Sequence, residues 1–260
     1  MRQNGMLNAE QFQTFHDNGY VIVDDVLSAD EVRHMVGALE SIERAGDHGD
    51  IGISWSDQTV TTIQTLPMLS GLLPRYLQFR PIVEMVEQLV GSKLRATGGL
   101  MLDKDPKANW DIGWHQDTGI YVKAIPQGEP DDVRAGLPVL STKNMELGRN
   151  VTCRLALDDS SPQTGGLYVL PGSHKSNLQP KGDVKERFAE VKGVPTTQKA
   201  GSVLCYCPLL LHRSEKSVLE TGRRRVLVAQ YGPADLTLPD TECYPFPQPV
   251  PLTAVDSLVA

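Results

Sequence analysis

The spacing of hydrophobic residues over the first third of the chain is mainly that of helices. Apolar positions recur every three or four residues in a segment that begins with Ser28 and Glu31 and ends at Gly46. A serine followed three residues later by a glutamate caps a helix N-terminus reciprocally, and glycine often follows a helix end. The pattern therefore predicts a helix here. Similar signals predict helices after Asn8 and from Pro81.

From about residue 93 the pattern changes to short strand-like segments separated by Gly, Pro and Asp turns. These segments are 93–102, 114–122, 150–159, 165–173, 201–212 and 224–231. In the first third, only residues 20–26 look like a strand. No long helical runs separate the later segments, so a parallel α/β sheet is disfavoured and a sandwich or barrel is favoured. We predict a mainly β fold with N-terminal helices.

The chain is predicted to be a single catalytic domain, 1–260, made of three parts. Residues 1–92 form a mostly helical support, 93–237 a β core, and 238–260 a proline-rich C-terminal arm. Repeated prolines exclude a long helix or a central strand from this arm. An extended arm could lie over the body of its own chain or over a second subunit in a homo-oligomer.

Residues 125–148 are rich in proline, glycine and charge, which predicts a long loop. Loops of this length in a compact domain often act as lids over a site. We treat the segment as a candidate lid. Its Asp131, Asp132 and Arg134 are candidates for contact with a polar substrate.

Composition limits the choice of partner and compartment. Apolar residues make up 40% of the 260 residues and charged residues 22%, as in ordinary soluble globular proteins, and the net charge is −7. This acidic balance argues against a nucleic-acid or anionic-membrane partner. The N-terminus lacks a signal-peptide pattern and no run is long enough to span a membrane, so we expect a cytoplasmic protein. Four cysteines without a CxxC pair predict buried thiols.

A histidine and an aspartate stand two residues apart in the segment GWHQDTGIY. In an extended strand, His115 and Asp117 would share a face. The two side chains could form an ion pair, a catalytic dyad or two ligands of a metal. For a third ligand, His174 sits in a Pro-Gly turn, whereas His212 ends a strongly apolar segment and is the better candidate. Two histidines and one carboxylate suit Fe(II) in oxygenases, and also zinc.

Three arginines, residues 223–225, lead the strand that follows His212. An arginine that enters a β core needs an anion to neutralise it. A dicarboxylate bound to the metal at one end and to the guanidinium at the other would meet this need, because the planar guanidinium binds a carboxylate through two hydrogen bonds.

Four stretches of the chain resemble the phytanoyl-CoA dioxygenase family of Fe(II)- and 2-oxoglutarate-dependent oxygenases. They are residues 15–32, 103–117, 154–175 and 208–231, which include WHQD, GGLYVLPGSHK and the later histidine followed by arginines. The resemblance implies a double-stranded β-helix, a cupin-like jelly roll, with helices packed against it. It also implies Fe(II) bound by His115, Asp117 and His212, with 2-oxoglutarate and O₂ as cosubstrates.

The family places one arginine on the distal carboxylate of 2-oxoglutarate. Counting from His212 gives Arg223, whereas aligning the strand that follows gives Arg224. Strand alternation allows only one of the two to face inward, and we favour Arg224. The resemblance also implies cosubstrate contacts from Ser214, Arg154 and Leu100. Three residues before the histidine motif are expected to shape the substrate pocket: Lys104, Asn109 and Trp110.

The activity so implied is oxidation, most simply hydroxylation, of an unactivated C–H bond in a small metabolite, with release of succinate and CO₂. A role in specialised-metabolite biosynthesis is our expectation. The carboxylate of Asp117 argues against halogenation, since halogenating relatives carry a small residue there. The alternative is a Zn- or Mn-dependent hydrolase or isomerase on a cupin-like barrel, which would not need an inward arginine.

Overall fold

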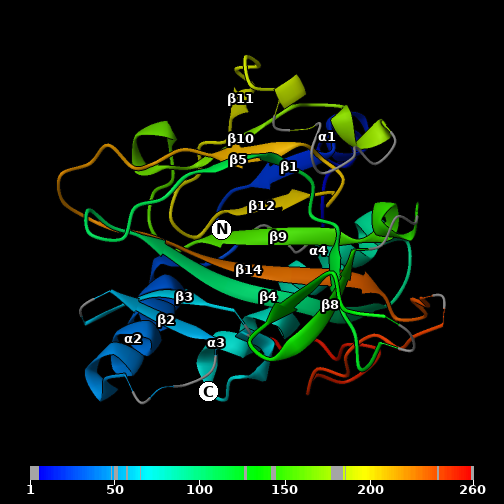
Figure 1. Cartoon of the computed structure of the whole chain (residues 1–260), viewed down its shortest axis with the longest axis horizontal. Coiled ribbons are helices and arrows are strands. Elements are labelled where there is room, and N and C mark those ends of the chain that lie inside the picture. The colour runs from blue at the N-terminus through cyan, green and yellow to red at the C-terminus, as the bar shows by residue number, and fades with distance from the viewer. Residues whose placement is uncertain are drawn as a thin grey trace.

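The computed structural model describes residues 6–258 except 48, 50, 51, 57, 65, 126, 127, 142–144, 177–183, 185 and 239. It is built on a seven-stranded antiparallel sheet and a four-stranded antiparallel sheet, which face each other across a cavity (Figure 1). A third, three-stranded sheet lies beside them.

The seven-stranded sheet has the order β1 (Tyr20–Val23), β12 (Val203–Tyr206), β9 (Val151–Ala156), β14 (Arg224–Pro233), β4 (Leu94–Lys104), β3 (Thr59–Ile63), β2 (Ile53–Ser56). The four-stranded sheet has the order β11 (Val194–Pro195), β10 (Leu167–Val169), β13 (His212–Ser214), β5 (Ile112–His115). The three-stranded sheet has the order β6 (Gly119–Tyr121), β8 (Leu137–Ser141), β7 (Asp132–Arg134).

The helices come mostly before residue 92. Among the described residues before that point, they are α1 (Ala9–Asn18), α2 (Ala29–Ala45), α3 (Leu72–Arg75) and α4 (Arg80–Val90). Short 3₁₀ turns are η1 (Leu66–Met68), η2 (Tyr76–Gln78), η3 (Met145–Arg149), η4 (Pro162–Thr164) and η5 (Ser173–Lys175). Helix α4 packs against β4, β9 and β14 and so covers the outer face of the large sheet.

The two faces of β14 show why the sheet can hold both a core and a site. Leu227, Ala229 and Tyr231 are fully buried in the core on the helix side. Residues of the other parity, Val228 and Gln230, line the cavity between the sheets. Because side chains alternate along a strand, one ten-residue strand fixes the core and one wall of the site together.

The predicted helix ends are confirmed. Both the Asn8 and the Ser28 N-caps form reciprocal capping boxes, and Gly91 ends α4 in the left-handed conformation. The expectation of a single strand in the first third was wrong. The hairpin of β2 and β3 extends the large sheet at its edge, where short strands with only partial burial show weak alternation.

Two segments predicted as single strands are each divided between sheets. The segment 114–122 contributes to β5 and β6, which belong to different sheets. The segment 201–212 ends its strand at Tyr206, and a turn follows in which Leu210 N–H donates to the Cys207 carbonyl at 2.8 Å. His212 therefore begins a strand instead of ending one, because proline at 208 cannot continue the ladder.

The segment 125–148 is not an unstructured loop in its described part. Residues 126, 127 and 142–144 lie outside the described residues, but β7 and β8 form a hairpin that pairs with β6. The C-terminal arm lies on the body of its own chain. Leu252 N–H donates to the Leu94 carbonyl and Val255 N–H to the Gln78 carbonyl, both at 2.8 Å.

The four cysteines are buried free thiols, as predicted. Within the described residues, none of the helices combines the length and the hydrophobicity needed to cross a bilayer.

Candidate active site

The pairing of β13 with β5 sets His212 directly opposite His115. Side chains of directly opposed residues in an antiparallel pair project to the same face. The two imidazole rings accordingly lie with their centroids 4.1 Å apart, although His212 is almost fully buried and the His115 side chain is 34% exposed. The two histidines therefore meet through sheet register.

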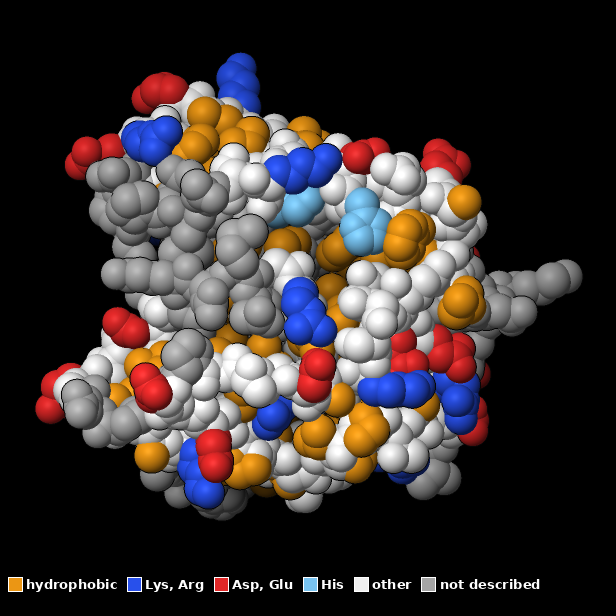
Figure 2. Space-filling view, turned by 90° about the vertical axis from the view of Figure 1, so that its right-hand side faces the viewer, with side chains coloured by type: hydrophobic (Ala, Val, Ile, Leu, Met, Phe, Trp, Pro, Cys, Tyr) orange, Lys and Arg blue, Asp and Glu red, His pale blue; other side chains and the backbone are white. Residues whose placement is uncertain are grey.

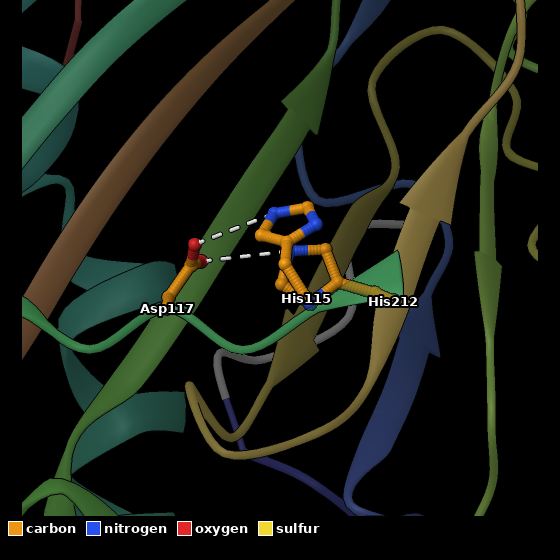
Figure 3. Close-up of side chains that lie close together, drawn as sticks. All are labelled: His115, Asp117 and His212. Carbon is orange, nitrogen blue, oxygen red and sulfur yellow. Dashed lines mark ion pairs between the residues drawn. The ribbon is translucent and has the colours of Figure 1, made fainter. Parts of the chain in front are cut away.

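Asp117 completes a three-residue cluster with these histidines (Figure 3). Its carboxylate oxygens lie 3.7 Å from His115 Nε2 and 3.6 Å from His212 Nε2. The Asp117 N–H donates to the Pro208 carbonyl at 2.8 Å, and the Tyr206 hydroxyl donates to the carboxylate at 3.0 Å. The strand alternation expected for this aspartate was wrong, because β5 ends at His115 and these two bonds position Asp117 instead.

Both histidines are oriented by backbone carbonyls. His115 Nδ1 lies 2.8 Å from the Gly113 carbonyl, and His212 Nδ1 lies 2.9 Å from the Leu210 carbonyl. A carbonyl only accepts, so each Nδ1 carries the proton and each Nε2 offers its lone pair toward the carboxylate. All three ligand atoms lie within 4.8 Å of one another. This donor set fits a divalent metal, and the two-histidine, one-carboxylate type suits Fe(II).

Electrostatics at the cluster favour the charge states that a metal requires. Burial, and then the neighbouring His115, lower the pKa of His212 to about 4 against the opposing effect of Asp117. Burial raises the pKa of Asp117, but His212, His115 and the Tyr206 hydrogen bond outweigh it, so that the pKa lies below its ordinary value. At neutral pH, His212 is neutral and Asp117 is ionised, as ligands must be.

As the pH falls from 6.5 toward 4, we expect the metal-free protein to lose stability through His212. The unfolded chain binds a proton at this imidazole near pH 6.5, whereas the folded protein excludes it down to about pH 4. The loss across this window is on the order of 3 kcal/mol. Urea unfolding at several pH values measures it. In the variant His212→Gln, the unfolding free energy should lack this part of its dependence on pH. The control His34→Gln, at an exposed site, should keep it. An equal dependence in His212→Gln and wild type would refute the prediction.

A cavity of about 440 Å³ contains the cluster and extends along β4 and β14. Histidine side chains reach the face of the molecule drawn in Figure 2, near hydrophobic side chains and a basic one. At one end of the cavity stand Lys104, Ser214 and Arg224, which come from both sheets. Arg224 and Lys104 are directly opposed in the β14–β4 pair, and this register brings the two cations together.

Arg224 is a buried guanidinium with unused donors. It is 2% exposed, and its one hydrogen bond in the described structure runs from Nη2 to the Gly165 carbonyl at 3.1 Å. Nε and Nη1 are buried and have no partner among the described residues. Burial, and then the charge of Arg154, lower its pKa to about 9. Burying a charged guanidinium destabilises the folded protein unless an anion pairs with it. A carboxylate suits this role, because it can accept two parallel hydrogen bonds from the planar guanidinium.

Lys104 adds a second cation at the same end. Its Nζ lies 2.6 Å from the Glu215 carbonyl, 3.2 Å from the Ser214 hydroxyl and 3.4 Å from the Gly165 carbonyl that Arg224 also uses. Burial, and then Arg224 and Arg154, lower the pKa of Lys104 to about 7. Two adjacent cations that share a neutral carbonyl strengthen the case for an anion at this end.

Most of the other site residues named from the sequence line the cavity. Leu100, Trp110 and Arg154 do so, and the Lys104 Nζ lies 5.6 Å from the Trp110 ring centroid. Asn109 does not. Its amide instead forms two hydrogen bonds with the Ser217 backbone, of 2.7 and 2.8 Å, which hold the segment after β13. Asn109 therefore does not line the cavity itself, and the expectation that it shapes the pocket stays a prediction.

Arg223, the alternative to Arg224, is engaged away from the cavity. It donates to Asp103 at 2.7 Å and to Glu43 at 2.6 and 3.1 Å. These two carboxylates raise the pKa of Arg223 although burial lowers it. Strand alternation separates the two arginines as predicted, and it is Arg224 that reaches the cavity.

Three further polar lining residues were not named from the sequence: Gln64, Tyr206 and Gln230. Gln230 could have been found by parity, since it is six residues after Arg224 on the same strand. Tyr206 could have been found as the residue that ends the strand before the turn to His212. Gln64 follows the short strand β3 and carried no signal.

The facing sheets, the His-Asp-His cluster and the buried guanidinium with unused donors in the same cavity are what a non-heme iron, 2-oxoglutarate-dependent oxygenase requires. Residues 15–225 match the model of the family described as phytanoyl-CoA dioxygenase (PhyH). The chain belongs to this family, which confirms the resemblance drawn from the sequence and makes the protein a dioxygenase of that class.

Related sequences are distant but cover most of the chain. The peroxisomal phytanoyl-CoA dioxygenase of Mus musculus is 24% identical, over 89% of this chain and 70% of the relative. The ectoine dioxygenase of Nocardia farcinica is 23% identical, over 94% of this chain and 84% of the relative.

Solved structures agree with the fold. EctD from S. alaskensis in its apoform has a TM-score of 0.70 at 17% identity, over 100% of this chain and 91% of that one. The non-heme alpha ketoglutarate dependent carbocyclase SnoK from nogalamycin biosynthesis has a TM-score of 0.67 at 20% identity, over 90% and 88%. The predicted double-stranded β-helix is confirmed.

Proposed function

We propose that the protein hydroxylates an unactivated C–H bond of a small metabolite, in specialised-metabolite biosynthesis. Iron with 2-oxoglutarate supplies the activation of O₂, with release of succinate and CO₂. The observation that carries the proposal is the position of three metal-ligand side chains and an incompletely paired, buried Arg224 in one cavity.

The proposed ligands are the Nε2 atoms of His115 and His212 and a carboxylate oxygen of Asp117. Tyr206 holds this carboxylate, and the carbonyls of Gly113 and Leu210 hold the rings. Such outer contacts fix ligand orientation before the metal binds.

Arg224 is proposed to bind the distal carboxylate of 2-oxoglutarate through its unused Nε and Nη1 donors. Lys104 and Ser214 lie at the same end and would complete its hydrogen bonding. Leu100 and Arg154 are part of the wall of the same cavity, where each lies opposite Val228 of β14, and are proposed to contact the cosubstrate. The apolar part of this wall limits the access of water to the bound cosubstrate.

The size of the cavity supports a small substrate, since about 440 Å³ must also accommodate 2-oxoglutarate. Relatives carry the names phytanoyl-CoA dioxygenase and ectoine dioxygenase, and SnoK comes from nogalamycin biosynthesis. A fraction of 6% aromatic residues and a net charge of −7 argue against a CoA ester here. The origin of SnoK in nogalamycin biosynthesis is the observation that supports a specialised metabolite.

The alternative, a zinc or manganese hydrolase or isomerase, does not explain why Arg224 is buried in the cavity. Such an enzyme needs the three ligands but not a buried guanidinium with unused donors. Membership of a dioxygenase family also decides against it.

An anaerobic titration tests the proposed cosubstrate site directly. Adding 2-oxoglutarate to the Fe(II)-loaded protein should produce a visible metal-to-ligand charge-transfer band, because Arg224 would hold one end of the keto acid and leave the other end free to bind the iron. The same protein exposed to O₂ should release succinate slowly even without substrate. Binding of Fe(II) without any band on addition of 2-oxoglutarate would refute the assignment and favour the hydrolase alternative.

A further inference from the structure

The cavity has a second polar end, distant from Arg224. Strand β14 runs along the cavity, and Gln230 lies six residues after Arg224, about 20 Å away at the usual rise of a strand. The Gln230 amide occupies the space over Gly98 that any side chain there would fill. Gln64 lines the cavity as well, and its carbonyl accepts from the Tyr121 hydroxyl at 3.2 Å. A five-carbon diacid held by Arg224 is too short to reach these two glutamines.

Arg134 of β7 lies at this second end. Its Nε donates to Asp132 at 2.8 Å, and both side chains line the cavity. The two terminal nitrogens of the guanidinium lie 3.7 and 3.8 Å from the position of a Cβ on Gly119, so the group extends over this glycine. Gly119 follows the proposed ligand Asp117 by two residues. The hairpin therefore brings a guanidinium close to the metal cluster.

The charge of the cavity lining is opposite to that of the whole chain. Four basic side chains and two acidic ones are among the described residues that line it: Lys104, Arg134, Arg154 and Arg224 against Asp117 and Asp132. The chain as a whole has a net charge of −7. The charges of Fe(II) and of the 2-oxoglutarate dianion cancel each other, so the positive excess remains when both are bound. A concave site with such an excess concentrates anions.

A purely structural role does not account for this arrangement. The Arg134–Asp132 pair is close to half exposed, with 43% and 47% of the side-chain surfaces accessible. Ion pairs of this exposure add roughly 0–1 kcal/mol to stability. The pair can hold the arginine in place at the cavity, but it gives little to the hairpin itself.

We propose that Arg134 binds an acidic group of the primary substrate, which is therefore a small organic anion such as a carboxylic acid. Gln64 and Gln230 hydrogen-bond to further polar substituents, and Asp132 orients the guanidinium. This assignment rests on the proposed function, because it takes the Arg224 end to be filled by 2-oxoglutarate.

Matched acids and amides test this assignment without knowledge of the natural substrate. The probes are small carboxylic acids and their primary amides, starting with benzoate and benzamide. Binding is measured by ligand-observed NMR to protein loaded with Zn(II), which is diamagnetic, and with saturating 2-oxoglutarate. We expect acids to bind the wild type about tenfold more tightly than their amides, as one charged hydrogen bond would provide.

Three variants separate charge from structure. Arg134→Gln should lose the preference for acids, Arg134→Lys should keep part of it, and the exposed helix control Arg44→Gln should keep all of it. Equal binding of acids and amides to the wild type, a lack of acid binding, or an unchanged preference in Arg134→Gln would overturn the proposal. The Fe(II)–2-oxoglutarate band of Arg134→Gln should persist; if the wild type lacks this band, the proposed function has failed independently of Arg134.

Discussion

Substituting Asp117 by alanine is expected to lower the affinity for Fe(II) by more than about 100-fold, beyond the 10–100-fold typical of outer-sphere changes. The carboxylate is the only anionic group of the three proposed ligands and lies within 3.7 Å of both imidazoles. Without it, two neutral nitrogens remain for a doubly charged ion. Metal content after dialysis, and the charge-transfer band with 2-oxoglutarate, measure the loss.

The variant Asp24→Ala is the matched control, since Asp24 is exposed and distant in sequence from all three ligands. It should bind Fe(II) as the wild type does. The Asp117→Ala protein should retain its fold by circular dichroism, because the two histidines are held by the pairing of β5 with β13 and not by this carboxylate. A band of normal intensity in Asp117→Ala would mean that the carboxylate is not a ligand.

Local chemistry in the sequence predicted the element ends well. The capping boxes at Asn8 and Ser28 and the stop at Gly91 depend on residues within one turn of each other, so the sequence alone carries the information. The hairpin β2–β3 was missed for the opposite reason. Its stability comes from pairing with β4, which is more than thirty residues away along the chain, and its own residues alternate poorly.

The site shows the same division. The two-residue spacing suggested that His115 and Asp117 act together, but strand alternation is not the reason why their side chains meet. Asp117 is positioned by a carbonyl of the turn before β13 and by the Tyr206 hydroxyl, which only the folded chain brings near. The meeting of His115 with His212 is a consequence of register between two short strands. Family resemblance supplied this long-range information, and periodicity could not.

The choice between Arg223 and Arg224 shows how parity and partners act together. Alternation along a strand predicts that adjacent arginines face opposite sides, without saying which faces the cavity. The carboxylates of Glu43 and Asp103 settle the direction, because they stand on the outer side and bind Arg223. Neither partner is close to the arginine in sequence, so the residues around the two arginines could not show which of them faces the cavity.

Replacing Arg224 by methionine is expected to raise the dissociation constant for 2-oxoglutarate by at least about 100-fold. Two hydrogen bonds to a charged carboxylate contribute roughly 3 kcal/mol or more together. The apoprotein should nevertheless be as stable as the wild type or more stable, because an apolar side chain replaces a buried guanidinium with two unused donors. Titration of the charge-transfer band measures the affinity, and thermal unfolding without ligand measures the stability.

The variant Arg223→Met should behave in the opposite way and therefore serves as the matched control. It removes the partner of Asp103, whose side chain has no exposed surface, so stability should fall by about 3 kcal/mol. Its affinity for 2-oxoglutarate should remain that of the wild type. Saturating 2-oxoglutarate should raise the unfolding temperature of metal-loaded wild type and Arg223→Met but not of Arg224→Met, since only the first two bind it. If Arg223→Met failed to bind 2-oxoglutarate and Arg224→Met still bound it, the assignment of Arg224 as the arginine that faces the cavity would be wrong. The anion that neutralises Arg224 would then have to be something other than 2-oxoglutarate.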